Sequence, residues 1–238
     1  MGKIWTVCSG SGGVGKTMIA LAMSVGAAKA GKKTILLDAS GAARSCDLIL
    51  GMESMMTLDM GDVLSHQIRM ETAIYPVAQY PNLYLACASV SEQVPVCELS
   101  GMILALHSLC DVLVIDMPTG QSFLGRGVMR AGDEYLFITR PDNPSIRSTE
   151  RLILRTRDSG SVTSSRLIIN RIVRDRIKRK TQYPQSTVEG LLDMPADACI
   201  PEDPSIPECE HNARAAIECN GPAWSVLSTL CKTLLNGA

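Results

Sequence analysis

The chain has 238 residues, 46% of them hydrophobic, and its 23 Lys and Arg nearly balance its 24 Asp and Glu. This composition can bury a core and excludes a disordered chain. A formal net charge of −1 gives no reason to expect nucleic acid or an anionic membrane as the main partner. The length fits one α/β domain with a large sheet, so we expect a single domain over residues 1–238.

Short runs rich in Val, Ile and Leu alternate with longer helical stretches along the whole chain. Continuous apolar runs are typical of parallel strands that are buried on both faces. The alternation therefore predicts a three-layer α/β fold with a mostly parallel sheet. The predicted strands are Ile4–Cys8, Thr34–Asp38, Leu83–Cys87, Val112–Asp116, Tyr135–Thr139, Leu167–Ile169 and Ala198–Ile200.

Two predicted helices have clear boundary signals. Thr17–Ala30 is apolar almost all round and is followed by Gly31, which suits the left-handed conformation after a helix. Asn143 and Pro144 are typical of a helix start, and we expect that helix to run to about Arg157.

Two further helices are expected near the end of the chain. Ser186 and Glu189 have the spacing of a capping box. A last helix follows Pro222, and one apolar stripe along it predicts packing onto the sheet rather than lipid insertion. The stripe consists of Trp224, Leu227, Leu230, Cys231 and Leu234.

The strongest motif is a glycine-rich run that fits G-x-x-x-x-G-K-[ST] and stands between a predicted strand and a predicted helix. The backbone N–H groups of such a loop, with the positive end of the helix, bind phosphate oxygens. We expect Lys16 to reach the β- and γ-phosphates of ATP and Thr17 to ligate Mg²⁺. The loop residues are Gly10, Ser11, Gly12, Gly13, Val14, Gly15, Lys16 and Thr17.

Two carboxylates end predicted strands. Asp38 ends the second strand, and Asp116 ends a strand followed by a short loop that includes Gly120. Ligands of open parallel sheets bind beyond the carboxyl ends of the strands. We therefore expect Asp116 to hold the metal ion or its waters, as a Walker B carboxylate does. The alternative for each aspartate is an ordinary turn residue.

The chain resembles the MinD/ParA family of deviant Walker ATPases, and most closely its MinD branch. The resemblance covers nearly the whole chain and implies a sheet of seven or eight strands, an ATP-dependent dimer and a protein partner. It is strongest at Ser9–Thr17, Leu36–Asp38, Asp47–Gly51 and Asp116–Gly120, and weaker at Ser145–Ser148, Asn170–Arg171 and Ile200–Asp203.

The resemblance also implies an adenine pocket. Its residues would be Asn170 and Arg171 together with Pro201, Glu202 and Asp203. Met18 belongs to the same nucleotide-binding set, but it stands where a hydroxyl residue would supply one more phosphate contact.

The sequence departs from the family pattern at two catalytic positions. Ser11 replaces the signature lysine, which reaches the nucleotide of the partner subunit, and Ser40 replaces an aspartate that orients the attacking water. Such a trans lysine resembles an arginine finger, an interaction that contributes ~10³–10⁵ in rate. Losing the water-orienting carboxylate compounds the effect, because positioning dominates phosphoryl transfer.

The catalytic and metal-binding positions Lys16, Thr17, Asp38 and Asp116 are retained. The pattern therefore predicts retained affinity with slow or lost hydrolysis, as in a MinD-like switch for positioning or scaffolding. The first alternative is an active ATPase for division-site placement or DNA segregation, in which Lys32 or Arg44 replaces the missing cation. A second alternative is a TadZ/CpaE-like pilus localisation factor.

The remaining reactive and charged residues indicate no further site. Nine cysteines without a C-x-x-C pair are expected to be reduced thiols of a cytoplasmic protein, which a partner can bring to the membrane. The three histidines lack metal-ligand spacing. The basic segment Arg174–Lys180 has the charge to contact DNA or anionic lipid, but we expect it to be a solvated helix face. We expect no secretory leader and no membrane span.

Overall fold

The structure is a computed structural model that describes residues 2–40, 45–88, 95–119, 131–158 and 164–237. These residues form one eight-stranded sheet in the order β3-β4-β2-β5-β1-β6-β7-β8, and every neighbouring pair except β3–β4 is parallel. The strands are β1 (Lys3–Cys8), β2 (Thr34–Asp38), β3 (Tyr75–Pro76), β4 (Leu83–Cys87), β5 (Val112–Asp116), β6 (Glu134–Thr139), β7 (Ser164–Ile172) and β8 (Ala196–Pro201).

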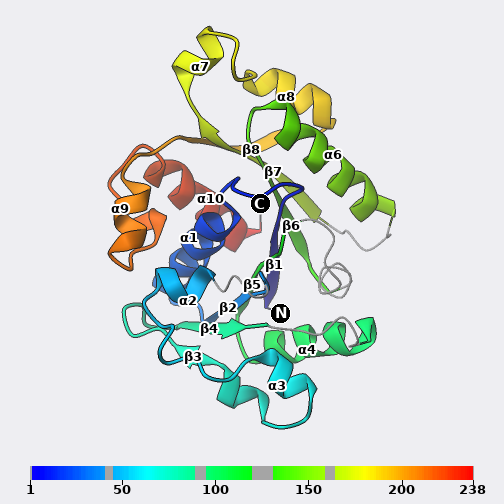
Figure 1. The fold of residues 1–238 in the computed structure, drawn as a ribbon, viewed down its shortest axis with the longest axis vertical. Coiled ribbons are helices and arrows are strands. Elements are labelled where there is room, and N and C mark those ends of the chain that lie inside the picture. The colour runs from blue at the N-terminus through cyan, green and yellow to red at the C-terminus, as the bar shows by residue number, and fades with distance from the viewer. Residues whose placement is uncertain (1, 41–44, 89–94, 120–130, 159–163, 238) are drawn as a thin grey trace.

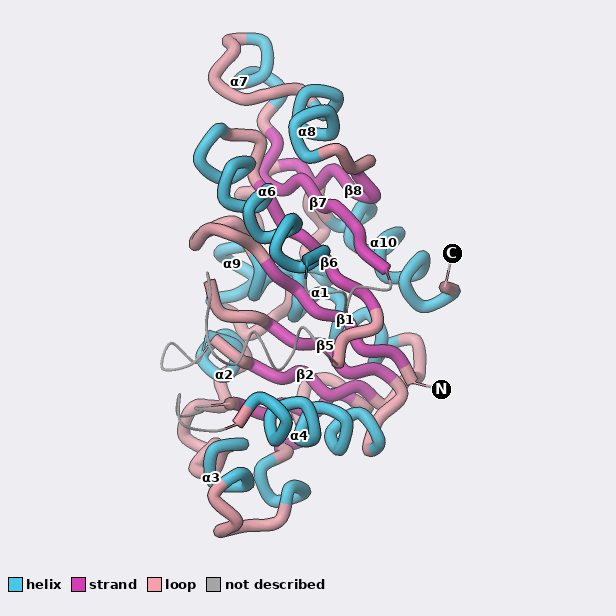
Figure 2. The backbone as a smooth tube through the Cα atoms, turned by 90° about the vertical axis from the view of Figure 1, so that its right-hand side faces the viewer, coloured by secondary structure: helices cyan, strands magenta, loops and turns pink. Residues whose placement is uncertain are grey.

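Helices cover both faces of this sheet (Figure 1). Figure 2 shows α4 and α6 on one face, with α1 and α10 on the other. The α-helices are α1 (Lys16–Lys29), α2 (Ser45–Ile49), α3 (Met60–Leu64), α4 (Val96–Ser108), α6 (Asn143–Asp158), α7 (Arg174–Lys178), α8 (Gln185–Leu192), α9 (Ile206–His211) and α10 (Trp224–Asn236), and two short 3-10 helices are η2 (Met70–Ala73) and η3 (Ala216–Glu218).

The sheet separates two hydrophobic cores. In β1, Trp5 and Val7 belong to the core under α1 and α10, whereas Ile4 and Cys8 belong to the core under α4, α6 and α8. Successive side chains of a strand point to opposite faces, so a central strand must be apolar throughout. The predicted three-layer, mostly parallel fold is confirmed.

All seven predicted strands are present, and the structure adds β3. This strand has only two residues and pairs antiparallel with β4 at the edge of the sheet. A two-residue strand cannot show a periodic pattern, so the sequence gives no signal for it.

Two predictions about helix details are wrong. Helix α8 begins at Gln185 after Pro184 without a side-chain cap, and Glu189 instead accepts a hydrogen bond from the Ala196 N–H at 2.9 Å. Trp224 is 48% exposed because it is the first residue of α10, before the buried part of the stripe. The other four residues of the stripe are buried as expected.

The prediction that all cysteines are reduced thiols is also wrong for one pair. Cys209 in α9 and Cys219 form a disulfide, with their Cα atoms 6.2 Å apart. Cys8, Cys46, Cys87 and Cys231 are buried thiols. The sequence did not indicate this pairing, because the two cysteines lie ten residues apart and form no recognised spacing motif.

Candidate functional site

The glycine-rich loop connects β1, the central strand, to α1 at the carboxyl edge of the sheet. Gly13 and Gly15 have φ values of +68° and +98°, a region that side chains disfavour. A Cβ atom at Gly15 would lie 2.3 Å from Asn170 Nδ2, and one at Gly10 would lie 2.0 Å from the Ser148 carbonyl oxygen. These glycines therefore allow a tight loop whose N–H groups can face a phosphate.

The side chains of Lys16 and Thr17 point back to the end of β5. Lys16 Nζ donates to Thr119 Oγ1 at 2.9 Å, and Thr17 Oγ1 donates to Asp116 Oδ2 at 2.6 Å. Burial lowers the pKa of Lys16, and the nearby Asp116 carboxylate opposes that shift. The ammonium is thus poorly solvated, and an anionic group beside it would stabilise its charge.

Asp38 and Asp116 end neighbouring strands and lie directly opposite each other in the β2–β5 pairing. Asp38 accepts hydrogen bonds from the Ser40 N–H and the Cys46 N–H, both at 2.9 Å. Within the part of the chain that the structure describes, Asp116 Oδ1 is buried and has no hydrogen-bond partner. The side-chain donor atoms of Asp38, Cys46 and Asp116 all lie within 4.8 Å of one another.

This arrangement fits a divalent cation. An unpartnered carboxylate oxygen and the Thr17 hydroxyl are the hard oxygen donors that Mg²⁺ prefers. Burial raises the pKa of Asp116 to about 7, and the charge of Asp38 adds to the rise, while the hydrogen bond from Thr17 opposes it. Two buried carboxylates side by side are costly without a compensating positive charge, which a cation or Lys16 supplies.

The raised pKa of Asp116 predicts a pH dependence of stability for the protein in EDTA without nucleotide. The folded protein holds this proton up to about pH 7, whereas the unfolded chain releases it near 3.8. The contribution of Asp116 to the free energy of unfolding should therefore fall as the pH rises between these values. We expect urea unfolding at pH 5 and pH 8 to show a larger drop for the wild type than for Asp116→Asn. An equal drop in both proteins would contradict the assignment.

Two adjoining cavities lie beside the loop. One of about 370 Å³ is lined by Lys16, Thr17, Ser40 and Thr119. A smaller one of about 80 Å³ is lined by Asn170, Arg171 and all three residues of the Pro201–Asp203 segment, with Ile206, Pro207 and Glu210 from α9. The structure thus brings together every residue that was expected near adenine, and Met18 lines both cavities.

The visible contacts of Asn170 are with the backbone. Its Nδ2 donates to the Val14 carbonyl at 2.8 Å, and its Oδ1 accepts from the Arg171 N–H at 2.9 Å. Asn170 therefore links β7 to the phosphate loop. Sequence reasoning missed the α9 residues, because their place beside the loop depends on the whole path of the chain.

Ser11 and Ser40, the serines at the two positions that depart from the family pattern, both lie at the carboxyl edge of the sheet. Within the described residues, Ser11 Oγ and Ser40 Oγ are buried and have no hydrogen-bond partner. Lys32 follows the far end of α1, about 20 Å from the loop for a 14-residue helix. It therefore cannot replace the missing cation within its own chain. Arg44 and Gly120 lie outside the described residues.

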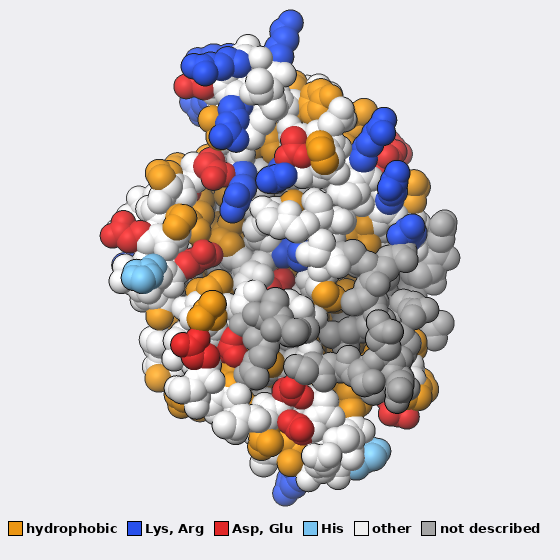
Figure 3. Space-filling view, in the orientation of Figure 1, with side chains coloured by type: hydrophobic (Ala, Val, Ile, Leu, Met, Phe, Trp, Pro, Cys, Tyr) orange, Lys and Arg blue, Asp and Glu red, His pale blue; other side chains and the backbone are white. Residues whose placement is uncertain are grey.

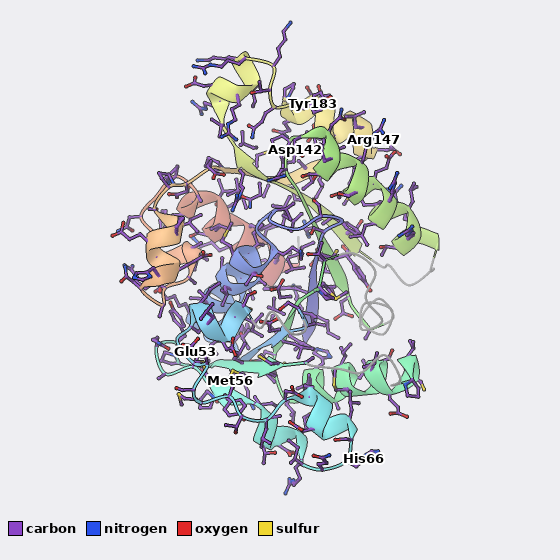
Figure 4. The ribbon with its side chains drawn as sticks, in the orientation of Figure 1. Glu53, Met56, His66, Asp142, Arg147 and Tyr183 are labelled. Carbon is purple, nitrogen blue, oxygen red and sulfur yellow. A yellow bond between two sulfur atoms is a disulfide. The ribbon has the colours of Figure 1, made fainter. Side chains whose placement is uncertain are left out.

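Other candidate residues lie away from this edge. Figure 4 shows His66 beside α3, at the end of the molecule opposite α7, whereas α1 lies in the middle (Figure 1). Figure 3 shows Lys and Arg side chains gathered over α7. No residue of α7 is buried, as a solvated helix face requires. Among the described helices, none combines the length and apolar character needed to cross a bilayer.

A glycine loop between a central parallel strand and a helix, with a buried lysine and two aspartates at adjacent strand ends, defines a P-loop nucleotide-binding protein. Residues 5–216 match the CobQ/CobB/MinD/ParA nucleotide binding domain. The chain belongs to this family.

MinD proteins are among the similar curated proteins. The septum site-determining protein MinD of Synechocystis sp. is 28% identical over 211 residues, which cover 87% of this chain and 78% of that protein. The MinD protein of Thermotoga maritima is 29% identical over 210 residues, with coverages of 87% and 78%.

MinD proteins are also among the similar solved structures. The cell division ATPase MinD of Pyrococcus furiosus is 26% identical, with a TM-score of 0.86 and complete coverage of both chains. MinD of Pyrococcus horikoshii, solved with Mg-ADP, is 25% identical, with a TM-score of 0.85 and coverages of 100% and 98%. A chain of the MinC:MinD complex of Aquifex aeolicus has a TM-score of 0.90 at 24% identity, with coverages of 99% and 96%, and this likeness shows the fold.

Proposed function

We propose that this protein binds Mg·ATP and uses the bound nucleotide as a switch, with hydrolysis slow or lost. In the proposed complex, the loop N–H groups and Lys16 hold the phosphates, and Thr17 and Asp116 hold Mg²⁺. The contacts of Lys16 with Thr119 and of Thr17 with Asp116 support these roles, because they orient both side chains towards one cavity. The Mg-ADP complex of the Pyrococcus horikoshii relative supports the choice of ligand.

One observation carries the proposal of slow hydrolysis. Ser11 and Ser40 stand where the family pattern has a lysine and an aspartate, and both hydroxyls are buried without a partner among the described residues. A serine hydroxyl supplies neither the positive charge for the transferring phosphoryl group nor a carboxylate that holds the attacking water. Bound Mg²⁺ would supply charge compensation to the phosphates, but it would not restore these two contacts.

We propose that the nucleotide sets a conformation that a partner protein recognises. Asp38 supports this role, because it holds the N–H groups of Ser40 and Cys46 next to the phosphate cavity. The MinC:MinD complex is a similar structure whose name includes a protein partner. A nucleotide-dependent homodimer, cytoplasmic or brought to the membrane by its partner, is part of the proposal.

The second candidate function is an active ATPase of the MinD/ParA type. The presence of Lys16, Asp38 and Asp116 in one buried group favours it, since these residues remain available for catalysis. The loss of both other catalytic positions is equally in keeping with a TadZ/CpaE-like localisation factor.

Phosphate release measured under saturating Mg·ATP tests the proposal. We expect turnover at least ~10²-fold below that of the Pyrococcus furiosus MinD relative, assayed alongside at one temperature, because two catalytic contacts are missing. Chromatography of nucleotide extracted after gel filtration should recover ATP rather than ADP. Turnover equal to that of the relative would reject the switch with slow hydrolysis and favour the second candidate.

A further inference from the structure

The two cavities beside the phosphate loop have a common wall. Gly15, Met18, Arg171 and Glu210 line both of them. Of these four residues, Arg171 and Glu210 are the ones with polar side chains. Arg171 belongs to β7 and Glu210 to α9, so a strand and a helix that are well separated in the sequence form this wall.

The order of base, ribose and phosphates in a nucleotide indicates which group would bind at this wall. The larger cavity contains the loop residues Lys16 and Thr17, where the phosphates would bind. The smaller cavity contains Asn170 and the Pro201–Asp203 segment, where the base would bind. The ribose connects the base to the phosphates, and it must therefore lie against the residues that both cavities share.

Glu210 has the chemistry that a ribose requires. Its carboxylate accepts hydrogen bonds and donates none, and the 2′- and 3′-hydroxyls of ribose are donors. Hydrogen bonds to an ionised acceptor are stronger than neutral ones. Glu210 is half-buried. Burial raises its pKa, and the charge of Arg171 opposes the rise.

We infer that Glu210 is the residue that selects ribonucleotides over deoxyribonucleotides, by accepting a hydrogen bond from a ribose hydroxyl. This inference rests on the proposed function, because it requires Mg·ATP to occupy both cavities. Arg171, whose Nε lies 3.9 Å from Glu202 Oε2, lines the same wall, and its positive charge would offset the repulsion between Glu210 and the phosphates. The ordinary alternative is that Glu210 is only a half-buried carboxylate in the field of Arg171, and in that case it would not distinguish the sugars.

Titration calorimetry with Mg·ATP, 2′-deoxy-ATP and 3′-deoxy-ATP tests this inference. We expect the wild type to bind ATP at least about tenfold more tightly than one of the two deoxy analogues, the effect of one hydrogen bond to a charged group. Glu210→Ala should bind all three nucleotides with equal affinity. Glu210→Gln retains an acceptor oxygen and should keep part of the preference.

Glu208→Ala is the matched control. Glu208 is an exposed carboxylate of the same helix, and neither cavity includes it. This variant should keep the full preference for ATP. A wild type that binds all three nucleotides equally, or a preference that survives in Glu210→Ala, would overturn the inference while leaving ATP binding intact. A wild type that binds none of the three would instead reject the proposed function, and the inference with it.

Discussion

Lys16→Ala is expected to abolish measurable binding of Mg·ATP. The Lys16 ammonium lies at the start of α1, and burial leaves it with Thr119 Oγ1 as its direct hydrogen-bond partner among the described residues. Charge-assisted hydrogen bonds contribute about 1.5–3 kcal/mol each, so losing contacts to two phosphates weakens binding by ~10²–10⁴-fold. Titration calorimetry with the wild type and the variant measures this loss.

Lys29→Ala is the control for this experiment. Lys29 lies in the last turn of the same helix, where it pairs with Glu218. Its replacement changes the charge of the protein by the same amount but leaves the loop intact. We expect it to bind Mg·ATP like the wild type. Circular dichroism and thermal unfolding establish whether Lys16→Ala is folded. If the folded variant bound Mg·ATP as tightly as the wild type, the loop would not bind the phosphates as proposed.

The double substitution Ser11→Lys and Ser40→Asp is expected to raise ATP turnover by ~10²-fold or more. Lysine at position 11 restores a cation for the transferring phosphoryl group of the partner subunit. Aspartate at position 40 restores a carboxylate beside Asp38, where the Ser40 N–H now contacts Asp38 Oδ1. A steady-state phosphate-release assay measures the gain, and light scattering or gel filtration with Mg·ATP reports on dimer formation.

Single substitutions and a neutral variant separate the two effects. Ser11→Gln has nearly the length of lysine without its charge, so it should give no gain. Either single substitution should give less than the double one, because the cation and the water-orienting group act together. Turnover of the double variant equal to that of the wild type, at unchanged affinity for ATP, would show that these two positions do not limit hydrolysis.

Local sequence patterns were sufficient to predict most of the fold. The continuous apolar runs marked all the long strands, because a parallel strand buried on both faces leaves no other pattern. The loop motif and the two strand-end aspartates were likewise sufficient to predict the core of the site. Each of these residues ends a strand or begins a helix, so a parallel sheet must bring them to one edge.

Features that depend on distant segments were not predictable in this way. The pairing of Cys209 with Cys219 spans only ten residues, but it depends on the turn that the chain makes after α9, for which the sequence has no motif. Glu210 approaches the loop on α9, which packs against η3, and η3 in turn packs against α1. Nothing in the residues next to Glu210 in the sequence indicates a nucleotide. The capping-box spacing at Ser186 is the opposite case, in which a local motif was present but the predicted cap did not form. Glu189 accepts a hydrogen bond from a backbone N–H of β8 instead, and the local sequence pattern does not reveal this alternative donor.

The two hydrogen bonds of Asp38 have a mechanical consequence. One carboxylate accepts hydrogen bonds from the N–H groups of Ser40 and Cys46, the two ends of a seven-residue span. Any event that pulls on this carboxylate, such as a cation arriving at its neighbour Asp116, acts on both ends at once. In the proposed switch, a change at the edge of the sheet would therefore reach the start of α2 through the hydrogen bond from the Cys46 N–H to Asp38.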